Sequence, residues 1–266
     1  MKKTSVHPRA ASTRKARQEN AATMAGKKAT PDGITLEGNG TAIKALGRHA
    51  PKANGAAMTA LATESTPPLQ ATGQQQYEKA LKLARHADRV GGPLPVELLH
   101  QAAATGYAPA QYALATWHLF GKGVRKSYKK AAVLLKQAAR QDFALAEFDL
   151  AVSYELGKGL PKSEPKARHF YLKAATHGDL QAQVETARCY FWGVGTAKNL
   201  VKAYQWYKKA AGKGHTEAQY CVALAYEHGD GVEQDIQKAL EWYKRAASGG
   251  DFDAKRALKR LQARVG

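Results

Sequence analysis

The sequence predicts an all-α fold, a right-handed α-solenoid of helix-turn-helix repeats, and a 36-residue period in residues 107–251 is the main reason. Alanine recurs at this step in four columns and glycine in two, without an insertion or deletion over four units. One alanine column holds Ala110, Ala146, Ala182, Ala218 and Ala254, and the others start at Ala131, Ala138 and Ala139. The glycine columns hold Gly121, Gly157, Gly193 and Gly229, and Gly123, Gly159, Gly195 and Gly231. Such a period is typical of stacked units that bury their apolar faces on one another.

The first half of each unit is predicted to be a helix. In residues 218–228, Ala218, Val222 and Tyr226 follow the spacing of one helix face. Gly229 and Gly231 come next in the chain. Because glycine adopts positive φ without strain, these residues are expected to end the helix and to let the chain reverse.

The second half of each unit is predicted to be another helix, which begins in a column of capping residues. Their side chains can accept a hydrogen bond from the free N–H groups of a first helical turn. The column holds Ser127, Ser163, Asn199 and Asp235. The helices are expected to end near Gly178, Gly214 and Gly250, and near Asp142 in the first unit. Helices of about 11 to 14 residues joined by short loops give antiparallel pairs.

Together these residues resemble a known family, the Sel1-like repeat (SLR), a relative of the tetratricopeptide repeat. The fourth unit carries the resemblance through Ala218-Gln219-Tyr220, Ala223, Tyr226, Gly229, Gly231-Val232, Asp235, Lys238-Ala239, Trp242-Tyr243-Lys244, Ala246-Ala247 and Gly250, and the third unit is similar. The similarity covers about residues 107–251. There are four departures: His118 replaces the tyrosine of the first helix, Leu134 and Phe170 replace the tryptophan, and Thr186 replaces a core leucine.

The period divides the chain into four full units, at 107–142, 143–178, 179–214 and 215–250, with a degenerate repeat or cap before them at 74–106. In this cap the two helices are expected at about 75–87 and 95–105, with Gly91, Gly92 and Pro93 between them. A C-terminal capping helix is expected within 251–266, from Phe252 to Val265. Its outer side is basic, as suits a terminal unit that faces water.

Residues 1–73 are expected to form a disordered basic arm. They contain no Trp, Tyr or Phe and no sustained apolar period, so they cannot bury enough surface to offset the entropy of ordering. Residues 1–76 have 11 Lys and Arg against 4 Asp and Glu, a charge of +7, and residues 77–266 have 30 against 18, a charge of +12. Two interpretations of the arm remain, a solvated tail or a segment that neutralises phosphates of nucleic acid or of an anionic membrane.

The chain shows no secretory signal or membrane segment. No apolar h-region occurs in the first 30 residues, and no stretch approaches the ~20 apolar residues of a membrane span. We expect a monomeric cytoplasmic protein, while organelle import and non-classical secretion stay open because the N-terminal composition suits either. Cys189 and Cys221 are 32 residues apart and so occupy different positions of their units, and we expect free thiols rather than a disulfide.

The sequence offers no candidate catalytic, cofactor-binding or metal-binding residues. The nine histidines include no i, i+4 pair joined by a carboxylate, and the two cysteines have no CxxC spacing. The Gly-x-Gly turns follow helices rather than strands, so they are not phosphate loops. His118 is predicted to be a packing substitute in the tyrosine column rather than a ligand or a base. We therefore expect a protein without enzymatic activity.

The remaining candidate is a surface for a protein partner. If the first helices line the inner curve, as the resemblance implies, they present an apolar and aromatic row, and its predicted groove residues are Tyr112, Phe120, Phe148, Arg188, Trp192, Tyr220 and His228. Such a row suits an extended peptide or an amphipathic helix. The alternative is that neighbouring first helices bury these side chains among themselves. The resemblance implies an adaptor or scaffold, in bacterial signalling, envelope regulation or host interaction; the alternative function adds docking of the arm on nucleic acid or anionic membrane.

Overall fold

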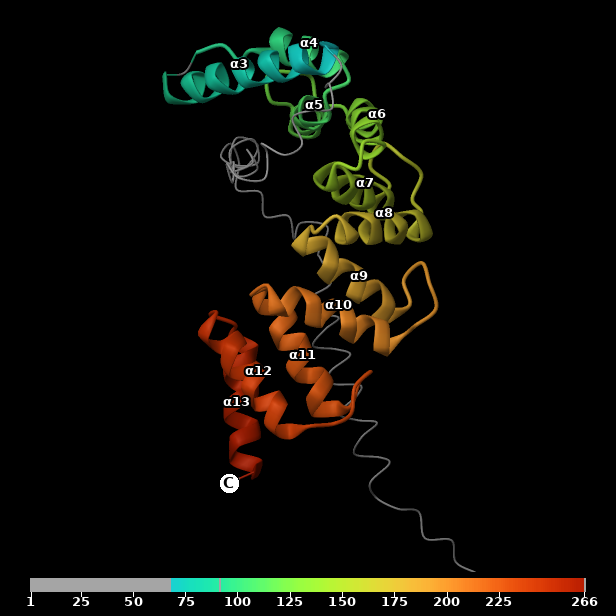
Figure 1. Ribbon diagram of the computed structural model, residues 1–266, viewed down its shortest axis with the longest axis vertical. Coiled ribbons are helices and arrows are strands. Elements are labelled where there is room, and N and C mark those ends of the chain that lie inside the picture. Colours follow the sequence, from blue (N-terminus) through green and yellow to red (C-terminus); the bar gives the residue numbers. More distant parts are fainter. Residues whose placement is uncertain (1–67, 91, 266) are drawn as a thin grey trace, which may run out of the picture. The chain divides into compact units, whose positions relative to one another are not determined.

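The computed structural model describes residues 68–90 and 92–265, and within them the chain forms eleven helices and no strand. The predicted arm lies outside the described residues up to residue 67. The helices are α3 (Pro68–Val90), α4 (Val96–Ala104), α5 (Ala108–Phe120), α6 (Tyr128–Ala139), α7 (Ala144–Leu156), α8 (Glu164–Thr176), α9 (Leu180–Trp192), α10 (Leu200–Gly212), α11 (Thr216–His228), α12 (Ile236–Ser248) and α13 (Phe252–Val265). Each helix packs on its neighbours along the chain (Figure 1). The predicted α-solenoid of helix pairs is confirmed.

The first helices of the four units, α5, α7, α9 and α11, end at the predicted glycines. The residue after each helix has left-handed backbone, with φ of 76° at Gly121, 69° at Gly157, 76° at Gly193 and 72° at Gly229. The second glycine of each turn lies two residues after the first, and at Gly195 a close contact between backbones also requires glycine. A Cβ on Gly195, where φ is +64°, would lie 2.5 Å from the carbonyl oxygen of Glu164 at the start of α8. The turn therefore touches the preceding second helix because no side chain separates them.

Three of the four predicted capping side chains accept a hydrogen bond from the backbone N–H three residues later. The distance is 3.3 Å at Ser127 and 2.9 Å at both Asn199 and Asp235. Ser163 has the extended backbone of a cap, but its side chain makes no capping hydrogen bond. In this helix Pro165 removes one of the first-turn N–H groups that a cap can bind.

The N-terminal cap differs from the prediction at its boundary. Helix α3 begins at Pro68, so residues 68–73 of the expected arm are helical, and the helix runs on to Val90 rather than ending near residue 87. Gly73 in this added turn is buried, and a Cβ there would collide with Thr105 and touch Tyr107. The added turn is thus held by close packing on the chain that follows α4. Helix α4 lies within the expected range of 95–105.

The core between the helices consists largely of alanine. The alanines of the repeat column are all 0 % exposed, namely Ala110, Ala146, Ala182, Ala218 and Ala254. Because a single methyl group lets helix backbones approach closely, a larger residue here would overpack the core. Cys189 and Cys221 are buried thiols that form no disulfide, as predicted, and burial raises the pKa of the Cys189 thiol to about 12.

Helix α13 matches the predicted C-terminal capping helix. Its buried face holds Ala254, Ala257 and Leu261, while Lys255 and Lys259 are exposed. A basic, water-facing side therefore closes the array, as the prediction requires. None of the described helices is long and apolar enough to cross a membrane.

Candidate functional site

One part of the predicted inner row is buried between helices. Tyr220 is 5 % exposed, and its ring centroid lies 5.8 Å from that of Tyr243 in α12. Phe148 packs on the second helix of its own unit in the same way. Tyr112 is half-buried and packs on Phe143, with ring centroids 5.5 Å apart. Truncation of these three predicted residues would therefore disturb packing as well as a groove.

The other part of the row lies at the C-terminal ends of the first helices, in a single column of the repeat. We call these four residues, Phe120, Leu156, Trp192 and His228, the exposed edge. Phe120 is 46 % exposed and Leu156 is 37 % exposed, whereas Trp192 and His228 are partly buried. The Trp192 ring meets Phe191 edge to face, with centroids 5.0 Å apart. The exposed edge thus places a ring or an apolar side chain at the same position of four consecutive units.

Arg188, the charged member of the predicted row, lies among acidic side chains. Its Nη1 donates to Oε1 of Glu185 at 3.0 Å. Burial lowers the pKa of Arg188, but the negative charges of Glu185, Glu217 and Glu155 outweigh this and raise it. Burial raises the pKa of Glu185, and Glu155 and Glu217 add to this rise although Arg188 opposes it. The Arg188 guanidinium therefore contacts Glu185 of its own helix and is stabilised by the charges of Glu155 on α7 and Glu217 on α11.

Two Glu–Tyr–Arg groups recur 72 residues apart, and sequence reasoning missed them. The groups are Glu155, Tyr171 and Arg188, and Glu227, Tyr243 and Arg260. In each group the tyrosine hydroxyl donates to Oε2 of the glutamate at 2.7 Å. In the second group Nη2 of Arg260 also donates to both carboxylate oxygens of Glu227, each at 2.7 Å, and Glu227 is 3 % exposed.

The other two units have apolar or aromatic residues at the same three positions. These are Leu119, Leu135 and Val152, and Phe191, Tyr207 and Leu224. We call each set of three equivalent positions a junction, since it joins one unit to the next. Polar and apolar junctions therefore alternate along the array. The signal that reveals this alternation is a period of two units, which is invisible when only neighbouring units are compared.

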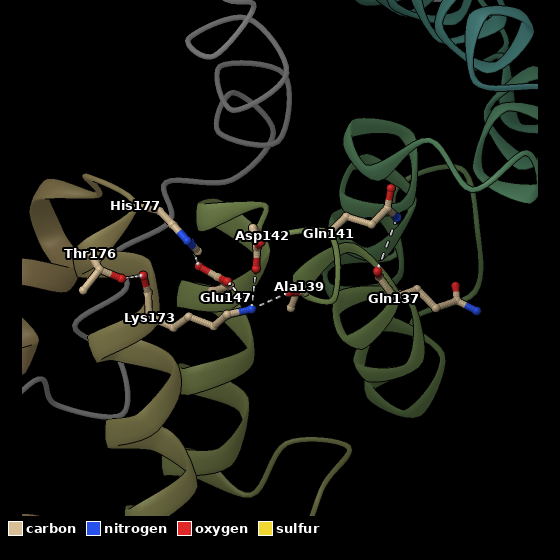
Figure 2. A network of polar contacts seen from close by, with 8 residues as sticks. All are labelled: Gln137, Ala139, Gln141, Asp142, Glu147, Lys173, Thr176 and His177. Carbon is tan, nitrogen blue, oxygen red and sulfur yellow. Dashed lines mark hydrogen bonds and ion pairs between the residues drawn. The ribbon is translucent and has the colours of Figure 1, made fainter. Parts of the chain in front are cut away.

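A polar network joins the first and second units at a break in a glutamine column. In the other three units this column holds Gln111, Gln183 and Gln219, whose amide groups donate to a carbonyl eight residues earlier at 3.4, 3.3 and 3.4 Å. Glu147 replaces glutamine in the second unit and has no N–H to donate. Figure 2 shows the substitute: Nζ of Lys173 lies 3.0 Å from Oε1 of Glu147 and donates to the equivalent carbonyl, that of Ala139, at 3.1 Å.

Two further residues complete this network. Lys173 Nζ lies 2.7 Å from Asp142 Oδ1, and His177 Nδ1 lies 2.7 Å from Glu147 Oε2. Asp142 stands in a glycine column and has φ of 58°, the sole positive φ outside glycine in the described ranges. The hydrogen bond and charge of Lys173 hold the pKa of Asp142 below its usual value. This bond offsets part of the strain of the left-handed backbone.

The network also contains a set of metal-type ligands. Asp142, Glu147 and His177 each place one ligand atom within 4.8 Å of the others, and no second group of this kind occurs in the described part of the chain. The Lys173 ammonium is in contact with both carboxylates and already supplies the positive charge that a metal ion would bring. We therefore interpret this group as an internal ion-pair network that replaces a glutamine hydrogen bond.

Charge is sorted between the two helix layers. The first helices α5, α7, α9 and α11 contain six acidic residues and one basic residue, Arg188. The second helices α6, α8, α10 and α12 contain twelve basic residues and two acidic ones, Glu164 and Glu241. The acidic residues of the first helices are Glu147, Asp149, Glu155, Glu185, Glu217 and Glu227. Glu147 and Glu227 are buried and paired with Lys173 and Arg260, so Asp149, Glu155, Glu185 and Glu217 remain against Arg188 and give the first helices an excess of negative charge.

Comparison with known proteins agrees with the repeat geometry. A family model described as the Sel1 repeat matches residues 108–143, 144–179, 180–215 and 216–251, more than half of the chain. The chain belongs to the Sel1 repeat family. Sel1 repeat proteins typically mediate protein–protein interactions, and their fold is generally a non-catalytic scaffold. A search of curated proteins gave no match.

Two solved structures are similar to these Sel1 units. A Sel1 repeat protein from Oxalobacter formigenes is 34 % identical, with a TM-score of 0.59, over 62 % of this chain and 48 % of that one. The protein c5321, a protective antigen present in uropathogenic Escherichia coli strains that displays an SLR fold, is 27 % identical, with a TM-score of 0.65, over 72 % of this chain and 43 % of that one. This chain thus matches less than half the length of either protein.

Proposed function

We propose that this Sel1 repeat protein is a non-enzymatic adaptor or scaffold that captures a segment of a protein partner on its first-helix face. The exposed edge carries the proposal, because Phe120 and Leu156 are 46 % and 37 % exposed and their equivalents recur in the next two Sel1 units. Apolar side chains that face water in register suit an extended peptide or an amphipathic helix. The other predicted groove residues, Tyr112, Phe148, Arg188 and Tyr220, lie on the same helices, where the three aromatic side chains pack against neighbouring rings.

Truncation of the exposed edge tests the adaptor function. Phe120→Ala with Trp192→Ala removes two anchors, each worth ~2 kcal/mol, so partner affinity should fall by roughly two to three orders of magnitude. The matched control is Val133→Ala with Val201→Ala, which shortens side chains that are 56 % and 54 % exposed on the second helices.

The assay begins with affinity capture by the wild-type chain from a lysate of the source cells, followed by calorimetry with each purified partner. A partner that binds the wild type and the valine control but not the edge variant supports the adaptor function. Equal binding to all three proteins would contradict it. Circular dichroism of both variants checks that the helices remain folded.

A second candidate function is docking of the basic N-terminal segment on nucleic acid or on an anionic membrane. The charge of residues 1–76 favours it, with 11 Lys and Arg against 4 Asp and Glu. Replacement of Lys2, Lys3, Arg14, Lys15 and Arg17 by glutamine in the full chain should abolish salt-dependent binding to duplex DNA or to vesicles that contain phosphatidylserine. Unchanged binding would exclude this segment as the contact.

A further inference from the structure

We propose that the first-helix face selects a basic peptide, with a partner's lysine or arginine held among Glu155, Glu185 and Glu217 and a neighbouring apolar side chain on the exposed edge. The inference rests on the proposed adaptor function and adds the chemistry of its partner. The three glutamates lie on α7, α9 and α11, so the surface spans three consecutive Sel1 units.

The charge of the two helix layers favours a basic partner. The protein has a formal net charge of +19, so its composition alone would give a basic first-helix face. The first helices instead hold six acidic residues against one basic residue, and four of the six remain once the buried pairs of Glu147 and Glu227 are set aside. The second helices hold twelve basic residues against two acidic ones. A basic segment is therefore attracted to the first-helix face and repelled from the opposite layer, which directs the encounter.

Local charge balance strengthens the argument. Glu155, Glu185 and Glu217 are partly buried, and Arg188 is the cation that lies among them. Three carboxylates and one guanidinium leave an excess of negative charge where solvent screening is reduced. Burial and the neighbouring carboxylates raise the pKa of Glu185, so an added cation would relieve this repulsion.

The chain itself shows how this layer binds a guanidinium. Arg260 of α13 donates to both oxygens of Glu227 at 2.7 Å. Glu155 occupies the equivalent position two Sel1 units earlier and accepts the Tyr171 hydroxyl at 2.7 Å, but its equivalent arginine, Arg188, donates to Glu185. In the ranges that the structure describes, no ion pair reaches Glu155. Arg188 acts on Glu155 through its charge and makes its hydrogen bond to Glu185, so the direct contact that Arg260 makes with Glu227 is open to a partner's cation at Glu155.

Apolar surface lies next to this carboxylate. Leu156 follows Glu155 in the chain and is 37 % exposed, and Trp192 occupies the same column one Sel1 unit later. A peptide that places a cation on Glu155 therefore meets an apolar contact nearby. This pairing distinguishes the expected ligand from a purely polycationic chain, which would leave the exposed edge in water.

The test uses the full chain and a fluorescein-labelled peptide of alternating lysine and leucine, with binding measured by fluorescence anisotropy. Glu155→Gln with Glu217→Gln keeps the Arg188–Glu185 pair and should weaken binding about tenfold or more. Glu164→Gln with Glu241→Gln removes the same charge from the second helices and should leave affinity unchanged. A peptide of alternating glutamate and leucine should not bind.

Two outcomes would overturn the inference. Equal binding of the glutamate–leucine peptide would show an apolar surface without charge selection, which leaves the adaptor function standing. Equal weakening by the two glutamine pairs would show diffuse attraction rather than a site. Failure of the adaptor function itself is detected separately, by the comparison of the Phe120 and Trp192 variant with the valine control.

Discussion

Substitution of Lys173 by methionine tests whether a charge network replaces the glutamine hydrogen bond between the first and second Sel1 units. The Lys173 ammonium contacts Glu147, Asp142 and the carbonyl of Ala139 at 3.0, 2.7 and 3.1 Å. Methionine keeps the apolar stem of the side chain and removes all three contacts. Glu147 is 0 % exposed, so the variant leaves a buried carboxylate with His177 as its remaining partner.

The magnitude follows from the burial of each contact. Removal of one partner from a buried ion pair costs ~3 to 5 kcal/mol. The Asp142 side chain is 65 % exposed, so its pair with Lys173 adds little. The Lys173 side chain is itself 32 % exposed, which places the expected loss at the lower end, ~3 kcal/mol. In a domain of this size such a loss lowers Tm by roughly 6 to 12 °C.

A second substitution identifies the cause. Glu147→Gln restores the residue that the other three units carry, and its amide can donate to the Ala139 carbonyl, so it should stay within ~1 kcal/mol of the wild type. The double variant Lys173→Met with Glu147→Gln should recover most of the loss, a coupling of ~2 kcal/mol in urea denaturation followed by circular dichroism. If the double variant is as unstable as Lys173→Met alone, the stranded charge is not the cause and the reasoning fails.

Three further predictions concern single positions. Gly195→Ala should reduce the free energy of unfolding more than Gly178→Ala, which costs ~1 kcal/mol. The reason is that a Cβ at 195 meets a carbonyl oxygen at 2.5 Å, while nothing lies within 4 Å of a Cβ at 178. Equal losses of stability in urea denaturation would contradict the close approach. Arg260→Met should cost ~2 to 3 kcal/mol because it leaves the buried Glu227 with the Tyr243 hydroxyl and the more distant Arg264, 3.8 Å away, whereas Lys259→Met on the same helix should leave Tm unchanged. Burial raises the pKa of Asp149 from 3.8 to about 6, so the contribution of this group to stability is present below about pH 4 and is lost as pH rises through 6. Asp149→Asn should therefore flatten the decline of stability over this window, by at most ~3 kcal/mol, and an unchanged pH profile would refute the role of burial.

The turns and caps could be predicted because each depends on local backbone. Positive φ at Gly193 and the capping bond at Asn199 need a particular residue type at a fixed place in the unit. The exceptions arise where packing or a neighbour intervenes. Gly73 interrupts the sequence pattern, yet it is buried where α3 packs closely on the chain after α4, so the helix starts earlier than expected. At Ser163 a cap residue is present, but its side chain makes no capping bond.

The polar network could not be predicted, because residue type alone does not say where a lysine points. Lys173 and Lys209 occupy equivalent positions of consecutive units. Lys173 reaches the buried Glu147, whereas Lys209 is exposed and lies over the Trp206 ring, with Nζ 4.9 Å from the centroid. The difference originates 26 residues away in the chain, where glutamate replaces glutamine. The orientation of the lysine side chain thus depends on which residue occupies the glutamine column of the first helix.

Because polar and apolar junctions alternate, the chemistry of the first-helix face repeats every two Sel1 units rather than every unit. Glu155 and Glu227 mark the two polar junctions, with an apolar junction between them. Because Arg260 of α13 occupies the second carboxylate, this capping helix neutralises Glu227, and Glu155, beside Leu156, is the carboxylate that we propose for a partner's cation. A partner that docks along several units would meet a cation-binding position once in every two units, so both its affinity and its register depend on the glutamate of the second unit.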